Sequence, residues 1–205
     1  MSYIPQAAVY LLALLLAGAL GCSGPQLAPP TEAAAPAPAP VERPEHPDQA
    51  TLKAALQGRY LSPREALELS DRLLVEGSLN FQDQETMARL ELLLLGAVKG
   101  EEKTSRAGLL RNLGIIHYHQ KKFKQARQEL QGANEINPKD ARTHFYLARL
   151  HARQEQVYLR KGDKKRAKGQ GRLADTEQGL ARKLEPSNSL YRQDIREIIR
   201  QEPAK

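Results

Sequence analysis

The chain of 205 residues lacks tryptophan, has a single cysteine, Cys22, and is only 5% aromatic. One cysteine cannot form an internal disulfide, so Cys22 is a free thiol, an intermolecular link or a chemical attachment point. The sequence also has no nucleophile elbow and no phosphate-cradling glycine loop, so we expect no enzymatic activity, no cofactor and no small-molecule substrate. No segment shows the period-two alternation of strands, and helix-forming residues dominate, which predicts an all-α fold.

Acidic residues are fewer than basic ones, 24 against 31, which gives a formal charge of +7. Residues 1–21 carry no charged side chain, so the whole excess lies in the rest of the chain. A basic balance allows lipid headgroups, nucleic acid or acidic proteins as partners and does not choose among them.

The N-terminal region has an uncharged apolar run over residues 7–20. Its length suits the core of a signal peptide and is too short to span a bilayer, which needs roughly 20 residues. The run closes in the order Ala-Leu-Gly-Cys, ending at Cys22, which resembles the lipobox of bacterial lipoproteins. The resemblance implies that residues 1–21 are cleaved off and that Cys22 is acylated, for example with palmitate. Because Ser23 follows the cysteine, it also implies an outer-membrane anchor facing the periplasm. The residues alone leave open an ordinary signal peptide with an incidental cysteine, or an uncleaved anchor.

Residues 22–49 are predicted to form a Pro/Ala-rich linker, since residues 23–49 hold eight of the chain's 13 prolines. Such a segment cannot bury a core and favours extended polyproline II. We interpret it as a disordered tether that lifts a domain off the bilayer. The alternative is a proline-rich ligand for a recognition domain.

Signals for helix ends are frequent in residues 50–205. The pattern Ser-Pro-Arg-Glu at 62–65 combines a capping box with proline at the first helical position, which predicts a helix to about residue 76. A second helix is predicted over 84–98, followed by a charged loop over 99–104.

The clearest pattern occupies residues 107–140, where two amphipathic helices flank a polar turn at 120–122. The order and spacing of six residues resemble the tetratricopeptide repeat, namely Leu113, Gly114, Phe123, Ala126, Ala133 and Pro138. Small residues let the two helices approach closely, and the proline ends the second helix. The resemblance implies a stack of helical hairpins.

A second unit, residues 141–186, repeats the Leu-small pair of 113–114 after 34 residues, at 147–148. Its turn at 162–163 comes seven residues late and its closing Pro186 comes 14 residues late. We therefore expect each of its helices to be about seven residues longer, which makes a protruding hairpin.

The remaining segments are predicted to close the stack at its two ends. A helix over 190–200 has its apolar residues largely on one face and suits a C-terminal cap, while residues 63–98 suit a degenerate first repeat. The fold prediction is thus about three hairpins plus a capping helix, after a disordered tether.

In the tetratricopeptide family, the first helix of each unit lines a concave face that commonly binds extended peptides. The resemblance carries this role to Arg111, Asn112, Ile115, Tyr118, His119, Arg142, Phe145, Tyr146, Arg149 and Arg153. Arginine and tyrosine are common interface anchors, and an acidic peptide or a terminal carboxylate could pair with the arginines. The alternative is that several of these side chains pack against the N-terminal hairpin.

The tip of the extended hairpin, residues 160–172, is strongly basic and holds one acidic residue, Asp163. Its basic residues are Arg160, Lys161, Lys164, Lys165, Arg166, Lys168 and Arg172. They could contact anionic lipid or an envelope polymer, at about 1 kcal/mol per residue near a lipid surface. The alternative is a solvated tip kept polar. We expect no nucleic-acid partner, because an exported protein rarely meets one.

Three histidines are candidate metal ligands. His144 and His151 lie seven residues apart, near one helical face, and His117 could lie one repeat away. No carboxylate motif accompanies them, so we expect packed and solvated histidines and no metal.

Together these features predict a membrane-anchored helical-repeat scaffold in the bacterial envelope. It would bind other cell-envelope proteins in the assembly of an envelope complex. The alternative is a surface-docking module that uses the basic tip.

Overall fold

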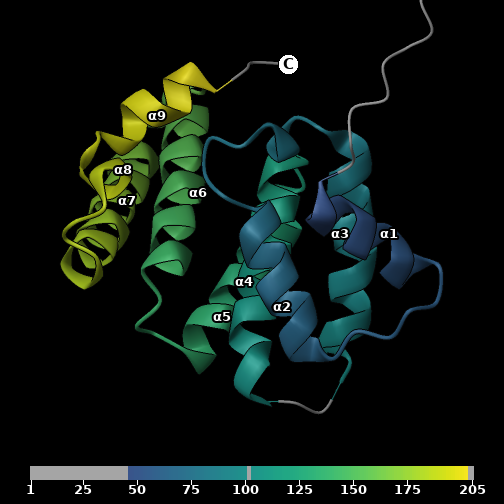
Figure 1. The fold of residues 1–205 in the computed structure, drawn as a ribbon. Helices are drawn as coiled ribbons and strands as arrows, with labels where there is room; N and C mark the ends of the chain where they lie inside the picture. The colour runs from purple at the N-terminus through teal and green to yellow at the C-terminus, as the bar shows by residue number, and fades with distance from the viewer. Residues whose placement is uncertain (1–45, 101–102, 203–205) are drawn as a thin grey trace, which may run out of the picture. The chain divides into compact units, whose positions relative to one another are not determined.

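The computed structural model describes residues 46–100 and 103–202. Every regular element in these two ranges is helical, as Figure 1 shows, so the all-α prediction is confirmed for them. The predicted signal peptide, Cys22 and the linker up to residue 45 lie outside the described residues. Within the described ranges, no helix is both long enough and apolar enough to cross a bilayer.

Helix α1 (Pro47–Leu56) begins inside the stretch predicted to be linker. Proline is well tolerated at the first helical position because its missing N–H has no partner there in any case. The side chain of His46 accepts the backbone N–H of Asp48 and caps the helix. Leu52 is fully buried, and α1 packs against the two helices that follow. The prolines therefore continue into the first turn of the folded region.

Helix α2 (Pro63–Leu73) opens with the predicted capping box. The N–H of Glu65 donates to Ser62 Oγ at 3.2 Å, and the N–H of Ser62 donates to Glu65 Oε2 at 2.8 Å. The helix ends short of the predicted residue 76, and a link containing a short 3₁₀ helix, η1 (Leu79–Phe81), follows it. Helix α3 (Gln84–Val98) has the predicted bounds.

Helices α4 (Lys103–His119) and α5 (Phe123–Ile136) form the predicted hairpin. Helix α4 starts inside the predicted loop over 99–104. The turn to α5 is tight, with Lys121 in the left-handed region at φ 63°. The two helices pack closely at Gly114. A Cβ atom added to this glycine would lie only 2.6 Å from Leu130 Cγ.

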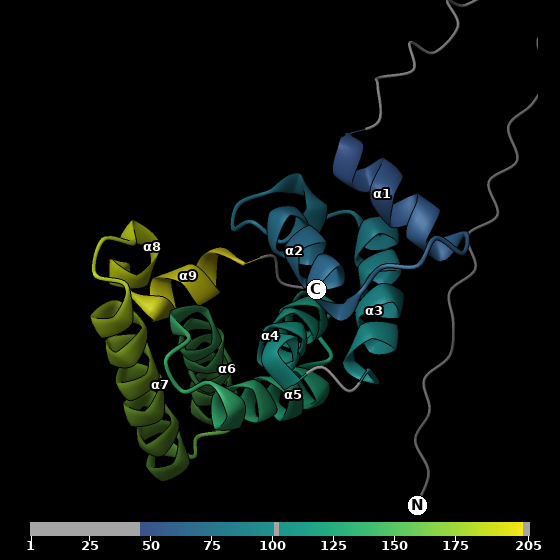
Figure 2. The same cartoon turned by 60° about the horizontal axis from the view of Figure 1, so that its bottom comes forward.

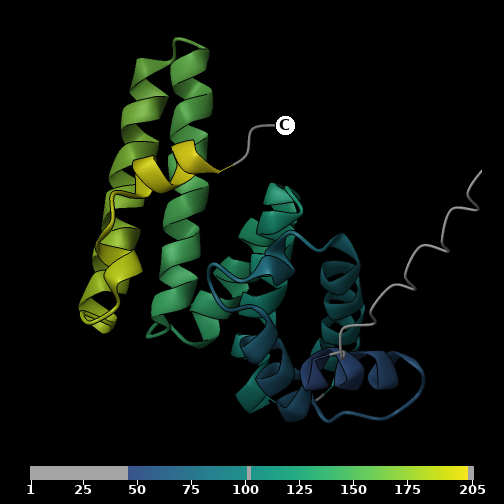
Figure 3. The same cartoon turned by 45° about the horizontal axis from the view of Figure 1, so that its top comes forward.

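Helices α6 (Ala141–Arg160) and α7 (Lys164–Leu184) form the extended hairpin. Figure 3 shows them side by side along their length. Helix α7 has 21 residues against 14 in α5, which matches the predicted increase of seven. Helix α6 has 20 residues against 17 in α4, so the same prediction is wrong for α6, because α4 already begins at Lys103. The turn between α6 and α7 falls at the predicted residues, with Gly162 at φ +73°.

The C-terminal segment forms two short helices, α8 (Ser189–Arg192) and α9 (Ile195–Gln201), so the prediction of one helix over 190–200 is wrong. Asp194 interrupts the helix because its side chain accepts the N–H of Arg196 and starts a new one. Helix α9 packs against α6, as Figure 2 shows.

Helix α4 contacts α2, α3, α5 and α6, so its buried face lies at the centre of the described helices. Its fully buried residues include Ile115 and Ile116. The helices on either side of α4 therefore decide which of its side chains a partner could reach.

Candidate functional site

The ten residues assigned to a concave face fall into three groups in the structure. The first group belongs to the core. Ile115, Phe145 and Tyr146 each have 0% exposure, and the ring of Phe145 lies 4.8 Å from that of Tyr191, centroid to centroid. A partner has no access to these three side chains.

The second group attaches α4 and α6 to the N-terminal helices. Asn112 is fully buried, and its Nδ2 donates to Ser70 Oγ at 2.7 Å and to Asp71 Oδ1 at 2.9 Å. Arg111 also pairs with Asp71, and Arg142 donates to the carbonyl oxygen of Leu74. These contacts correspond to the alternative in which several of the ten pack against the N-terminal hairpin.

The third group consists of Tyr118, His119, Arg149 and Arg153, which line one pocket of about 330 Å³. The link between α2 and α3 supplies one wall of the pocket, and the residue after α9, Glu202, supplies part of another. The remaining lining residues are Glu76, Gly77, Ser78, Phe81, Gln82 and Lys121. Helices α4 and α6 therefore contribute their arginines and aromatic rings to a cavity that other segments enclose.

Arg149 is the charged centre of this pocket and is only 5% exposed. Its guanidinium carbon lies 4.6 Å from the ring centroid of Tyr118 and 4.7 Å from that of Tyr146. Burial opposes the charge of Arg149, but the nearby Tyr146, Tyr118 and Glu76 outweigh burial and raise its pKa. The guanidinium is thus a fixed cation between aromatic rings, an arrangement that stabilises a desolvated charge.

His119 adds surface to the pocket without adding charge. Its ring stacks on Phe81 with centroids 4.0 Å apart, and its Nε2 lies 3.0 Å from Tyr146 Oη. Burial, together with the positive charge of Arg149, lowers the pKa of His119 to about 3. The imidazole is therefore neutral near pH 7.

The two carboxylates of the pocket come from residues that the sequence pattern did not single out. Glu202 pairs with Arg149 Nη2 at 2.6 Å and with Arg153, and its two carboxylate oxygens share the single hydroxyl proton of Tyr118, with Oη 2.9 and 3.0 Å away. Glu76 accepts a hydrogen bond from Tyr146 Oη and lies 3.5 Å from Arg149 Nη1. Neither glutamate belongs to the first helix of a repeat, so no local signal could have identified them.

Each of the three histidines considered as metal ligands is bonded to a residue of its own hairpin, and His117 also contacts Glu91 of α3 through Nε2, at 2.9 Å. His117 Nδ1 lies 2.6 Å from Glu129 Oε2, and His151 Nδ1 lies 2.8 Å from Gln170 Oε1. His144 Nδ1 lies 2.6 Å from Glu177 Oε2. In residues 46–100 and 103–202, no cluster of three or more His, Cys, Asp or Glu is placed to hold a metal ion.

The surroundings of His117 and His144 favour the protonated form of each imidazole. Burial opposes the charge of His117, but hydrogen bonds to Glu129 and Glu91 outweigh burial and raise its pKa. The hydrogen bond to Glu177 likewise raises the pKa of His144. Because the pKa of each histidine is higher in the folded than in the unfolded chain, where it is about 6.5, protonation stabilises the fold. This stabilisation is complete at pH values below about 6.5 and is lost as the pH rises through the pKa of the folded state.

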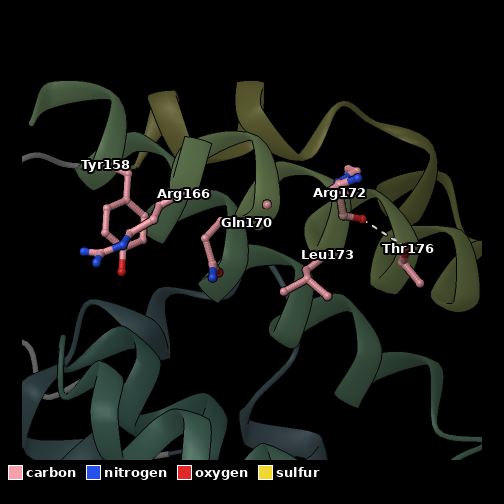
Figure 4. Close-up of a pocket in the computed structure, with 7 residues that line it drawn as sticks. Tyr158, Arg166, Gln170, Arg172, Leu173 and Thr176 are labelled. Carbon is pink, nitrogen blue, oxygen red and sulfur yellow. Dashed lines mark hydrogen bonds between the residues drawn. The ribbon is translucent and has the colours of Figure 1, made fainter. Parts of the chain in front are cut away.

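The basic tip is exposed at all seven of its basic residues. Arg166 lies 3.4 Å from Asp163 and stands over the ring of Tyr158, 5.8 Å from its centroid. Figure 4 shows the shallow hollow beside this pair, which continues along α7 to Arg172, Leu173 and Thr176. The hollow measures about 490 Å³, and Leu173 is 45% exposed at its edge. This surface suits an anionic partner with some apolar character.

Searches with this chain matched no family model, no curated protein and no solved structure. The function proposed below is therefore supported by this chain's own residues.

Proposed function

We propose that the chain is a membrane-anchored helical-repeat scaffold that binds other cell-envelope proteins in the assembly of an envelope complex. Acylated Cys22 would be its anchor, in the outer membrane with the domain facing the periplasm. The observation that carries the binding role is the pocket at Arg149 and Arg153, where one buried and one partly buried cation lie against aromatic rings. Such groups are typical interface anchors.

The recurrence of buried small residues in the second hairpin supports the repeat part of this proposal. The small residues that allow close packing recur in the second hairpin, with Ala174 and Ala181 standing 48 residues after Ala126 and Ala133. All four are buried at 0–1% exposure. The Leu-small pair recurs after 34 residues, and both of its leucines are buried. A hairpin whose buried small residues recur in the next hairpin is the building block of a helical-repeat scaffold.

The test is a cross-linked pull-down of the tagged lipoprotein from membranes, with Arg153→Gln beside the wild type. Arg153 is only partly buried, so its replacement leaves the core intact. The matched control is Arg182→Gln, which removes the same charge from an exposed position on α7, outside both the pocket and the basic tip. We expect envelope proteins to be captured by the wild type and the control and lost with Arg153→Gln. Equal capture by all three would rule out the pocket as the binding site.

A second candidate function is docking of the basic tip on anionic lipid or envelope polymer. It is favoured by the exposure of all seven basic residues and by Leu159, which is 55% exposed beside them. Such binding should weaken steeply with salt, because exposed charges are screened beyond about 10 Å at moderate ionic strength.

Liposomes that contain phosphatidylglycerol test this second function. Neutralising Lys164, Lys165 and Arg166 to glutamine should abolish binding if the tip docks. The charge-matched control replaces three exposed lysines on other segments, which are Lys53, Lys99 and Lys139. Equal loss in both triple variants would show that net charge, and not the tip, is responsible.

A further inference from the structure

Glu202 occupies the pocket lined by Arg149 and Arg153 in the way a bound ligand would. Its carboxylate accepts a bifurcated hydrogen bond from Tyr118 Oη and pairs with Arg149 and Arg153. Three donor side chains from two different helices, α4 and α6, thus converge on one carboxylate. Charge-assisted bonds of this kind are the strong ones, and arginine favours planar carboxylates.

Glu202 provides this carboxylate from the C-terminal end of the described helices. Glu202 directly follows α9, and that helix is held by its own buried side chains, Ile195 and Ile199. Arg196 adds a further attachment, with Nε 2.8 Å from Glu155 Oε2. The docking of α9 therefore does not depend on Glu202, and a swing of this one side chain would open the pocket.

Removal of Glu202 would leave the pocket with unbalanced positive charge. Glu76, the other acidic side chain in the pocket, is held by Tyr146 Oη and faces the guanidinium of Arg149 at a longer distance. His119 is neutral, and Arg149 is 5% exposed. Glu76 would then be the one carboxylate in the pocket near two arginines, so the open pocket would favour another carboxylate close to Arg149 and Arg153.

We infer that Glu202 is an intramolecular occupant of a carboxylate-binding site, and that an acidic side chain of a partner protein takes its place. This inference rests on the proposed scaffold function and gives the ligand its chemical class. An intramolecular carboxylate competes at an effective concentration set by its short connection, which reaches the millimolar range. Free acidic peptides should accordingly bind weakly to the wild type and more tightly once Glu202 is removed.

The test uses the tetrapeptide Gln-Glu-Pro-Ala, acetylated and amidated so that its glutamate carries the only charge. Binding to the full chain is followed by NMR titration of the arginine side-chain signals. We expect Glu202→Gln to bind the peptide at least about ten-fold more tightly than the wild type. The matched control is Glu197→Gln, which removes an exposed carboxylate from α9 outside the pocket and should bind like the wild type.

Two further variants keep the test specific to the pocket. In the Glu202→Gln background, Arg153→Gln should abolish binding. If that variant unfolds, Tyr118→Phe replaces it, because it removes only the hydroxyl group that contacts Glu202. Equal affinity in the wild type and Glu202→Gln, or equal binding of a Gln-Gln-Pro-Ala peptide, would overturn the inference.

Failure of the inference can be told apart from failure of the scaffold function. If membrane partners are captured equally by the wild type and Glu202→Gln, the displacement inference fails and the scaffold remains. If Glu202→Gln binds the tetrapeptide while no envelope protein is captured, the carboxylate site stands and the scaffold function fails.

Discussion

Two glycines of the same hairpin offer a direct measure of how closely α4 and α5 approach. A Cβ at Gly114 would lie 2.6 Å from Leu130 Cγ and 3.2 Å from the carbonyl oxygen of Ala126. Leu130 is fully buried, and its Cγ is a branch point near the backbone, so it has little room to move. A Cβ at Gly132 would meet only Leu110 Cδ1, at an ordinary 3.5 Å. Alanine should therefore clash at the first position and fit at the second.

The pair separates two opposing effects of alanine. Replacing a glycine in a helix interior by alanine stabilises by about 1 kcal/mol through backbone entropy, and this gain applies to both positions. Overpacking a well-filled contact typically costs about 1–3 kcal/mol, and this cost applies to Gly114 alone. The unfolding free energy of Gly132→Ala should thus exceed that of Gly114→Ala by about 1–3 kcal/mol. Gly132→Ala should be slightly more stable than the wild type.

Urea unfolding of the purified chain, followed by far-ultraviolet circular dichroism, measures both variants against the wild type. The comparison holds if the slopes with denaturant agree, because a changed slope signals a changed unfolded state. A Gly114→Ala variant as stable as Gly132→Ala would refute the close approach. The helix pair would then tolerate a side chain at this point, and the repeat-like packing would lose its main physical support.

Three further predictions concern pH, capping and the anchor. The free energy of unfolding should fall as pH rises above about 6.5, and His117→Gln should reduce that fall by at most about 1.4 kcal/mol per pH unit. An unchanged pH profile in urea titrations would show that His117 is not protonated preferentially in the folded state. Ser62→Ala should lower stability by about 1 kcal/mol through loss of the N-cap, whereas Ser62→Asp, which keeps a capping oxygen, should not. Cys22→Ala should leave the signal peptide uncleaved and abolish labelling with radioactive palmitate, and persistent labelling would contradict the lipoprotein prediction.

Local patterns predicted much of the helical layout. The bounds of α3, the capping box of α2 and the turns before α5 and α7 follow from side chains that act within a few residues of each other. The increase of seven residues in α7 over α5 was readable because seven residues make nearly two turns and preserve the buried face. The same increase was wrongly predicted for α6, which is only three residues longer than α4, because α4 begins before the expected start of its repeat. The start of α1 and the break at Asp194 were missed, since proline at a first turn and an internal cap each suggest more than one structure.

The candidate site was only partly predictable. Sequence spacing placed arginines and aromatic residues on the first helices of two hairpins, and four of the ten side chains do meet in one pocket. Burial of Ile115 and Phe145 could not be predicted, because it depends on which segments cover those helices. Spacing within a helix gives the face of a residue but not what packs against that face.

By itself, the sequence determined the class of fold and the positions of most helices, because capping, turn chemistry and close packing of small residues act over short stretches of chain. Only the tertiary structure decided what the arginines contact. Glu76 reaches Arg149 across 73 residues and Glu202 reaches it across 53 residues. Contacts this distant along the chain leave no periodic trace in the sequence, since they form only when separately folded helices pack together.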